Sequence, residues 1–408
     1  MHHAFFAGPN ANRAAATVKI PRMEHTRDPL ARLRAATARR GAAGLRRTLR
    51  ARTPDDGGLI DLASNDYLGL ARNGRLAEAA VEATRTWGTG STGSRLVTGS
   101  TALHARLEAA LCAFAGAESA LVFSSGYLAN LSAVAALGAG GLVVSDAGNH
   151  ASIVDACRLS RARVVVTPHK DVVAVEKALA DRDEEHALVV TDAVFSVDGD
   201  LAPLEELHAA AVRQGALLVV DEAHALGVIG PGGRGAVYGA GLAGERTIVR
   251  TVTLSKSLGA QGGAVLGASE VIETLVDTGR SFIFDTGLAP GSVAAALAAV
   301  DILRTQPELP GLVRTRAREL ASVARELGLE TGEPAGAVVP VVLGAPEAAL
   351  RAALICAEHG VRAGCFRPPS VPVGRSCLRL TARANLSSDD LAVIRAALTA
   401  VAEMKVSM

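Results

Sequence analysis

The chain has 408 residues, 49% of them hydrophobic and 3% aromatic, which is enough apolar material for a sizeable core and for two or three domains. Acidic and basic residues almost balance at a formal net charge of +1, which argues against the basic surface of a nucleic-acid-binding protein. The longest mildly apolar stretch, 131–145, is interrupted by glycines and is too short to span a membrane. The five cysteines have neither CxxC nor metal-ligand spacing, which indicates reduced thiols, a cytoplasmic location and no metal site.

The first 27 residues have no helical period and contain Gly, Asn and Pro, so we expect a poorly ordered extension. Residues 28–60 place leucines among many arginines and predict an N-terminal helical segment. Residues 61–290 form the expected large domain, because short Val/Leu-rich runs alternate with helical segments there. This alternation predicts a mostly parallel sheet. The seven predicted strands are 119–124, 142–146, 163–167, 187–192, 216–221, 247–253 and 263–267.

The pattern changes after about residue 290, where a long helical stretch leads into a smaller unit, residues 291–408. Its predicted strands are 338–343 and 377–383. Ser387 and Asp390 have the spacing of a capping box that opens the last helix. The expected fold class is therefore α/β, with a large domain around a seven-stranded sheet and a small C-terminal α/β domain.

Two motif matches are interpreted as accidental. Residues 221–224 spell DEAH, as in helicases, but the sequence contains no GxxxxGK[ST] loop to hold nucleotide phosphates. Residues 230–235 fit GxGxxG without joining a strand directly to a helix, so the context of a dinucleotide-binding motif is missing.

Ionisable and hydroxyl side chains gather where the predicted strands end. In open α/β sheets, ligands bind in the crevice outside the carboxyl ends of the strands. Four different strands deliver polar groups to this edge of the sheet, which predicts a ligand site there. The residues are His150, Asp192, Ser196, Asp221, His224, Thr253 and Lys256.

These residue types suit a carbonyl cofactor with a phosphate group. A deprotonated lysine such as Lys256 can form a Schiff base, and a carboxylate can keep a pyridine nitrogen protonated. The segment SSGYLAN, 124–130, predicts a helix start whose free N–H groups bind phosphate. Taken singly, each residue has an ordinary structural explanation, and only their shared position favours a site. Five other histidines are expected at exposed helix or loop positions: His104, His169, His186, His208 and His359.

The ordered motifs SNDYLGL (64–70), TGSRLVTGS (92–100), SSGY (124–127), TDAVFSVDGDLAPL (191–204), DEAHALGVIGPGGRG (221–235) and TLSKSLG (253–259) resemble the α-oxoamine synthase family. The likeness runs from about residue 28 to the end. It implies a fold-type-I pyridoxal 5′-phosphate enzyme, an acyltransferase that joins an amino acid to an acyl thioester with loss of carbon dioxide. It also implies a homodimer whose sites lie at the subunit interface.

The resemblance assigns roles residue by residue. Lys256 would hold the cofactor as a Schiff base and handle the α-proton, Asp221 would pair with the pyridine nitrogen, and His150 would stack on the ring. Ser196 and His224 would bind the ring's phenolic oxygen. Gly126, Tyr127 and Thr253 would bind the phosphate, with Thr286 reaching the phosphate of the neighbouring subunit. The implied substrate-binding residues are Arg379, for the amino-acid carboxylate, and more weakly Asn65, Arg46 and Arg367.

Within the family, TGSRLVTG and FRPPSVPVG (366–374) are most similar to the biotin-pathway branch, which condenses L-alanine with a pimeloyl thioester of coenzyme A or of a carrier protein. The alternatives are glycine or serine with another acyl-CoA and, remotely, a pyridoxal-phosphate-binding regulator without catalysis. Two positions depart from the family pattern. Ala225 replaces a usual glycine and could crowd the cofactor edge, and Cys377 replaces a usual basic residue.

Overall fold

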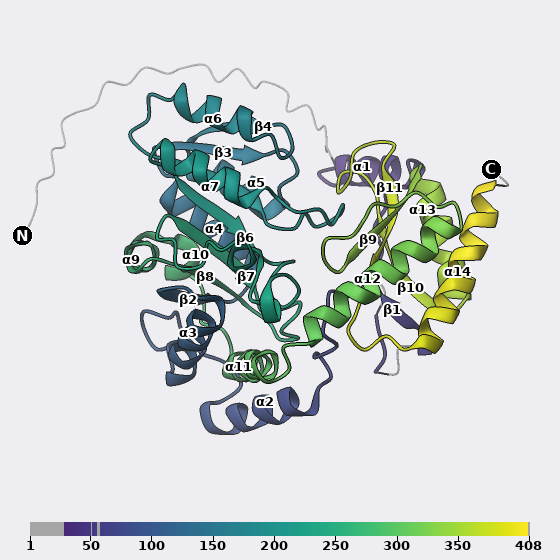
Figure 1. Ribbon diagram of the computed structural model, residues 1–408, viewed down its shortest axis with the longest axis horizontal. Helices are drawn as coiled ribbons and strands as arrows, with labels where there is room; N and C mark the ends of the chain where they lie inside the picture. The colour runs from purple at the N-terminus through teal and green to yellow at the C-terminus, as the bar shows by residue number, and fades with distance from the viewer. Residues whose placement is uncertain (1–27, 50, 55–57, 407–408) are drawn as a thin grey trace, which may run out of the picture. The chain divides into compact units, whose positions relative to one another are not determined.

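A computed structural model describes residues 28–49, 51–54 and 58–406 (Figure 1). The predicted extension 1–27 lies outside the described residues. The described residues divide into two compact units, residues 28–49 and the residues from 51 onward, and each is considered by itself. In the first unit, helix α1 (Ala31–Ala42) carries no buried residue, which agrees with the predicted surface helix.

The second unit contains a seven-stranded sheet in the order β2-β8-β7-β6-β5-β3-β4. Only β8 runs antiparallel to its neighbours, so the sheet is mostly parallel, as predicted. All seven predicted strands are confirmed to within one residue at each end. Their bounds are β2 Ser119–Phe123, β3 Leu142–Asp146, β4 Arg163–Thr167, β5 Ala187–Asp192, β6 Leu217–Asp221, β7 Ile248–Thr253 and β8 Gly263–Gly267.

Both faces of this sheet are covered, which explains why its central strands read as continuous apolar runs. Val143, Val190 and Val219 point to the face that packs on α4, α5 and α9. Their neighbours Val144, Val189 and Val220 point to the face that packs on α6 and α7. The helices that belong to this sheet are α2 Gly74–Trp87, α3 Ala102–Ala115, α4 Gly126–Leu137, α5 Ala151–Ser160, α6 Val172–Ala180, α7 Leu204–Arg213, α8 Ala236–Gly239, α9 Ser269–Thr278, α10 Arg280–Ile283 and the 3₁₀ turn η2 Pro231–Gly233.

A second sheet has the order β1-β10-β11-β9, with β1 Ile60–Leu62, β9 Val338–Gly344, β10 Val361–Phe366 and β11 Ser376–Thr381. Strands β9 and β11 were predicted. Strands β1 and β10 were missed because one has three residues and the other contains Arg362 and Gly364 instead of an apolar run. The remaining helices are α11 Pro290–Thr305, α12 Leu309–Glu326, α13 Pro346–Glu358 and α14 Ser388–Val406. The capping box is confirmed, since Ser387 and Asp390 exchange backbone-to-side-chain hydrogen bonds of 2.8 and 3.1 Å.

The domain boundaries at residues 61 and 290 stay a prediction. Strand β1 pairs with β10 in the second sheet, and α11 packs against α2 and α3 beside the first sheet. Chain segments therefore pass from one sheet region to the other near both proposed boundaries. Among the described residues, no helix is both long and apolar enough to cross a membrane.

A buried ion pair lies in the core, next to Asp221 at the end of β6. Glu222 and Arg250 are 0% and 3% exposed, and their side chains form a salt bridge. Arg250 also donates to the Ala115 carbonyl at 2.6 Å, and Glu222 accepts from the Val237 N–H at 2.9 Å. Gly235, with φ of +105°, is required here because a Cβ would lie 2.5 Å from Glu222 Oε1. Every strong charge in this cluster therefore has a partner.

We expect Glu222→Ala to lower the free energy of unfolding by about 3–5 kcal/mol, because it leaves the Arg250 guanidinium buried without its counter-ion. The control is Asp301→Ala, which removes an ion pair to Arg75 whose side chains are 51% and 52% exposed. That change is expected to cost less than about 1 kcal/mol. Urea unfolding of both variants at one fixed cofactor concentration measures the difference, and equal losses would contradict the role of burial.

Candidate active site

A hydrogen-bonded chain of side chains ends at Lys256. The Lys256 Nζ lies 2.7 Å from His224 Nε2, and His224 Nδ1 lies 2.5 Å from the Tyr67 hydroxyl. Tyr67 is 0% exposed, so it cannot exchange this partner for water. The hydroxyl of Tyr67 also reaches Asn65 Oδ1 at 3.3 Å. Residues from three distant parts of the sequence therefore converge on the amine.

The surroundings favour an uncharged amine at Lys256. Part of its side chain is accessible, but burial around the amine lowers the pKa of Lys256 to about 8, against the opposing effect of Asp221. Burial also holds the pKa of His224 well below its ordinary value, and Lys256 and Arg379 add to this shift. Burial raises the pKa of Tyr67 to about 12, so its hydroxyl stays protonated. A lysine of this kind can act as nucleophile or base near neutral pH.

The carboxylate of Asp221, at the end of β6, is fixed by donors on one side. Asn130 Nδ2, from α4, donates to it at 2.6 Å, and the backbone N–H of Ala223 donates at 2.8 Å. Asn130 is itself oriented by Thr251, whose hydroxyl donates to Asn130 Oδ1 at 2.5 Å. These contacts hold the charged form of Asp221 in place, ready to pair with a protonated ring nitrogen.

The same network reaches His150, the N-cap residue of α5. Asn130 Nδ2 donates to Ser152 Oγ at 2.8 Å, and the Ser152 hydroxyl lies 2.7 Å from His150 Nδ1. The Ser152 backbone N–H also donates to this Nδ1, so Nδ1 is an acceptor and the ring proton is on Nε2. Burial lowers the pKa of His150, which agrees with a neutral imidazole. The His150 ring lines a cavity of about 760 Å³, in a position to cover a planar ligand.

Arg379, on β11, is 3% exposed and anchored by three contacts. Its Nε donates to the Ser196 carbonyl at 2.6 Å, its Nη1 donates to Asn65 Oδ1 at 3.0 Å, and its guanidinium lies 5.3 Å from the centre of the Phe366 ring. Its Nη2 is buried and has no partner among the described residues. A buried cation with an unused donor suits the carboxylate of an amino acid.

The predicted phosphate-binding residues Gly126 and Thr253 are neighbours in space. Gly126 opens α4, where the first N–H groups of a helix have no partner within the helix. A Cβ at Gly126 would lie 3.0 Å from the Thr253 Cβ, and a Cβ at Gly263 would lie 2.5 Å from the Gly126 nitrogen. Two glycines therefore permit the close approach that a phosphate cradle needs.

Asp192 is the least satisfied carboxyl group in this region. It is 1% exposed, and neither of its oxygens has a hydrogen-bond partner among the described residues. Its Cα is the register partner of the Asp221 Cα on the adjacent parallel strand, so both side chains leave the same face. Burial and the charge of Asp221 raise the pKa of Asp192 well above its ordinary value. The neutral form of Asp192 is therefore favoured beside the carboxylate of Asp221.

Four predicted residues lie outside the hydrogen-bonded groups around Lys256, Asp221 and Arg379 and outside the pair Gly126 and Thr253. The hydroxyl of Tyr127 donates to Asp155 at 2.6 Å, and Thr286 forms an isolated bridge with Ser94. Arg367 follows β10 and interacts with Cys365. Arg46 belongs to the N-terminal unit, so its role stays a prediction.

Several residues that orient the site were not predicted from the sequence. Tyr67 lies within the motif SNDYLGL. Asn130 and Ser152 lie inside helices and Thr251 lies inside a strand, where no sequence pattern marked them. The predicted exposure of His104 and His208 is wrong, because both are buried. His104 caps the start of α3 together with Thr101 and contacts the Leu288 carbonyl at 3.0 Å. Ala225 is fully buried within the apolar cluster that α6 and α7 cover, and Cys377 is 2% exposed.

A cavity of about 760 Å³ adjoins the cluster. One wall consists of the segments that follow β3 and β5, including His150 and Ser196. The opposite wall comes from the second sheet and the loop after β10, including Phe366 and Val371. The lining is mainly apolar with a few charged groups, as in sites for elongated organic ligands.

The donor set fits pyridoxal phosphate and does not fit a metal. The structure combines a lysine of lowered pKa, a fixed carboxylate, a neutral imidazole and a glycine-lined helix start in one place. The residues that the structure describes contain no cluster of His, Cys, Asp or Glu suited to a metal ion.

The chain is similar to a known protein family over most of its length. The model of the family "Aminotransferase class I and II" matches residues 58–398. The 8-amino-7-oxononanoate synthases of Mycolicibacterium gilvum and Mycolicibacterium smegmatis are each 60% identical over 374 residues, which cover 91% of this chain and 97% of the relative.

Solved structures of related enzymes have the same fold. The serine palmitoyltransferase of Sphingomonas wittichii superposes with a TM-score of 0.87 at 30% identity, over 93% of this chain and all of the other. The 8-amino-7-oxononanoate synthase of Francisella tularensis superposes with a TM-score of 0.73 at 25% identity, over 86% of this chain and 98% of the other. The chain therefore belongs to the class I and II aminotransferase family, in the group of the 8-amino-7-oxononanoate synthases.

Proposed function

We propose that the chain is a pyridoxal-phosphate-dependent acyltransferase of biotin biosynthesis. It condenses L-alanine with a pimeloyl thioester to give 8-amino-7-oxononanoate, carbon dioxide and the free thiol. The observation that carries this proposal is the joint presence of a lysine of lowered pKa beside Asp221 and a buried Arg379 with an unused donor. The 60% identity to 8-amino-7-oxononanoate synthases supports the choice of substrates.

Bound pyridoxal phosphate supplies an aldehyde that reacts with amines and a ring that draws electrons away from the α-carbon of the attached amino acid. Asp221 keeps the ring nitrogen protonated, because Asn130 and the Ala223 N–H hold its charged carboxylate in place. His150, as a neutral imidazole at the cavity, would cover the ring. Gly126 and Thr253 bind the phosphate at the start of α4.

Arg379 binds the carboxylate of L-alanine through Nη2, while Ser196 and Asn65 hold its other nitrogens. Lys256 takes the α-proton, since its pKa near 8 leaves a useful fraction of the amine unprotonated at neutral pH. His224 lies within hydrogen-bonding distance of this amine and is fixed from behind by Tyr67, so the proton stays within a buried network. The deprotonated amino acid would displace the thiol from the thioester carbonyl, and loss of carbon dioxide from the β-keto acid would leave a carbanion. The proton held at Lys256 beside His224 would then return to that carbon to give the product.

The acyl thioester occupies the 760 Å³ cavity, whose apolar lining suits a pimeloyl chain. We also propose that the enzyme is a cytoplasmic homodimer in which Thr286 binds the phosphate held by the partner subunit. In support, Thr286 is exposed and takes no part in the hydrogen bonds around Lys256.

The direct test is product analysis by mass spectrometry after a single turnover with L-alanine and pimeloyl-CoA. We expect 8-amino-7-oxononanoate and one carbon dioxide per turnover. Parallel reactions replace L-alanine by glycine or L-serine, and pimeloyl-CoA by palmitoyl-CoA or a pimeloyl carrier protein. Faster product formation from serine and palmitoyl-CoA would overturn the substrate assignment in favour of the activity named for the serine palmitoyltransferase relatives.

Lys256→Ala is expected to lower kcat by more than about 10³-fold, because both amine exchange and proton transfer are lost. Lys405→Ala, at an exposed lysine in the last helix, is the matched control and is expected to leave kcat unchanged. Added methylamine should restore part of the activity of the Lys256 variant by supplying a free base. Turnover within tenfold of the unaltered enzyme, without added amine, would contradict the role of Lys256.

Arg379→Lys is expected to raise the KM for L-alanine by about 10- to 100-fold, since an ammonium cannot keep both anchors and also bind a carboxylate with two donors. The KM for the thioester should change much less. Arg75→Lys, at an exposed ion pair, serves as control. Steady-state kinetics with each substrate varied in turn measures the effect. An unchanged KM for alanine would place its carboxylate elsewhere.

A further inference from the structure

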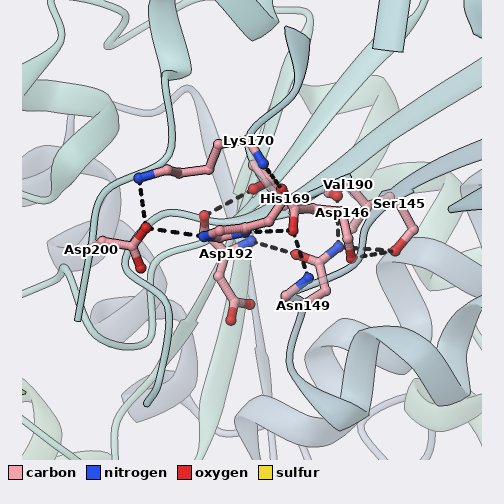
Figure 2. Close-up of polar contacts among 10 residues, drawn as sticks. Ser145, Asp146, Asn149, His169, Lys170, Val190, Asp192 and Asp200 are labelled. Atoms are coloured by element: carbon pink, nitrogen blue, oxygen red, sulfur yellow. Dashed lines mark hydrogen bonds and ion pairs between the residues drawn. The ribbon is translucent and has the colours of Figure 1, made fainter. Parts of the chain in front are cut away.

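Three loops of the large sheet meet at His169, in the segment between β4 and α6 (Figure 2). His169 Nδ1 lies 2.9 Å from Asp146 Oδ1 at the end of β3, and Nε2 lies 3.0 Å from Asp200 Oδ2 in the loop after β5. The loop after β3 also carries His150, and the loop after β5 also carries Ser196. One imidazole therefore joins the two loops that supply these site residues.

Both bonds of His169 require an N–H, because ionised carboxylates only accept hydrogen bonds. A neutral imidazole has one N–H, so it would turn a lone pair toward one of the two carboxylates. Burial lowers the pKa of His169, but the hydrogen bonds that it donates to Asp146 and Asp200 outweigh this effect and raise the pKa above its ordinary value of 6.5. The geometry and the direction of the pKa both point to an imidazolium.

The two carboxylates are themselves held in position. Asp146 accepts the backbone N–H groups of Gly148 and Lys170 at 2.6 and 2.7 Å. Asp200 forms a salt bridge of 2.6 Å with Lys170 Nζ, and although burial opposes it, Lys170 and His169 lower the pKa of Asp200. Asp146, Asp200 and Lys170 are the charged groups that contact or flank the imidazole.

The side chain of His169 is 38% exposed and contacts residues of both loops directly. The His169 and Phe195 rings meet edge to face with centroids 4.3 Å apart. A Cβ at Gly148 would lie 2.8 Å from His169 Nδ1, so a larger residue there would push the ring away from the loop of His150. The loops therefore cannot separate without breaking these contacts.

The joined loops form one wall of the 760 Å³ cavity. Residues 147–151, His169 and residues 195–198 all line it. We propose that His169 is a positioning residue of the enzyme: as an imidazolium, it holds the loops of His150 and Ser196 together and so shapes the wall against which the acyl thioester binds. The thioester part of this inference rests on the proposed function, whereas the joining of the loops does not.

The direction of the pH dependence follows from the raised pKa. The stabilisation that His169 provides is fully present below about pH 6.5, the ordinary value for histidine. It is lost as the pH rises through the higher value in the folded protein. At alkaline pH the neutral ring holds only one carboxylate and the wall loosens.

The test compares His169→Ala and Asp200→Asn with the unaltered holoenzyme. KM for pimeloyl-CoA and kcat are measured from pH 6 to pH 9. The KM of His169→Ala divided by that of the unaltered enzyme is expected to be about tenfold at pH 6 and to approach one at pH 9, with a smaller change in kcat. Using this ratio removes the titration of Lys256 and of other groups that the two proteins share.

Asp200→Asn provides the conservative rescue. Asp200 Oδ2 contacts both His169 Nε2 and Lys170 Nζ, while Oδ1 has no partner among the described residues. After a rotation of the terminal group, the amide of the variant can donate to a neutral imidazole through its nitrogen and accept from Lys170 through its oxygen, so the contact no longer needs the second proton. We expect this variant to keep a low KM across the whole range. His359→Ala is the control, because His359 is exposed and its Nδ1 contacts only the Ile355 carbonyl of its own helix. It should change neither parameter.

Thermal unfolding of the same holoenzymes without substrate keeps the inference separate from the choice of substrate. The Tm difference between the unaltered protein and His169→Ala should be larger at pH 6 than at pH 9. If pimeloyl-CoA is not a substrate, this difference persists and only the kinetic part must be repeated with the active thioester. A Tm difference that is the same at both pH values, or a KM ratio that does not vary with pH, overturns the proposal.

Discussion

The chemistry of this protein depends on placing an amine and a carboxylate together where water is scarce. Burial lowers the pKa of Lys256 to about 8, while Asp221 limits the shift by favouring the charged amine. A lysine left in water would be protonated at neutral pH, and one buried alone would shift much further. The balance requires Asp221 to stay charged, and the neutral Asp192 beside it allows that, because only one of two adjacent buried carboxyl groups needs to ionise.

The fold achieves this with parallel strands whose carboxyl ends share one edge. Strands β3, β5, β6 and β7 end at Asp146, Asp192, Asp221 and Thr253. Helix α4 then reaches across with Asn130, which links Asp221 to Thr251 and, through Ser152, to His150. The ends of the strands supply the functional groups, and a buried amide on one helix links Asp221 and, through Ser152, His150. The second sheet adds Arg379, which contacts both Ser196 and Asn65.

Much of this arrangement was predictable, and the physical reason is periodicity. Strands buried on both faces appear as continuous Val/Leu runs, and the more exposed edge strand β4 is also rich in valine. All seven strands were therefore located, and the residues at their ends could be assigned to one edge of a sheet. Strands β1 and β10 lack that pattern and were missed. His104 was wrongly assigned to the surface because a histidine that caps a helix over a buried carbonyl looks, in the sequence, like any polar helix residue.

By itself, the sequence determined the class of fold, the order of the strands along the chain and the residue types at the sheet edge, since these follow from local pattern and motif spacing. Only the tertiary structure decided how those residues are paired. That Tyr67 holds His224 across 157 positions, that Asn130 orients Asp221, and that His169 bridges two carboxylates all depend on distances between segments far apart in the chain. Burial decided the rest, because the protonation states of Lys256, His150 and Asp192 depend on the water and charge around them and not on their neighbours in sequence.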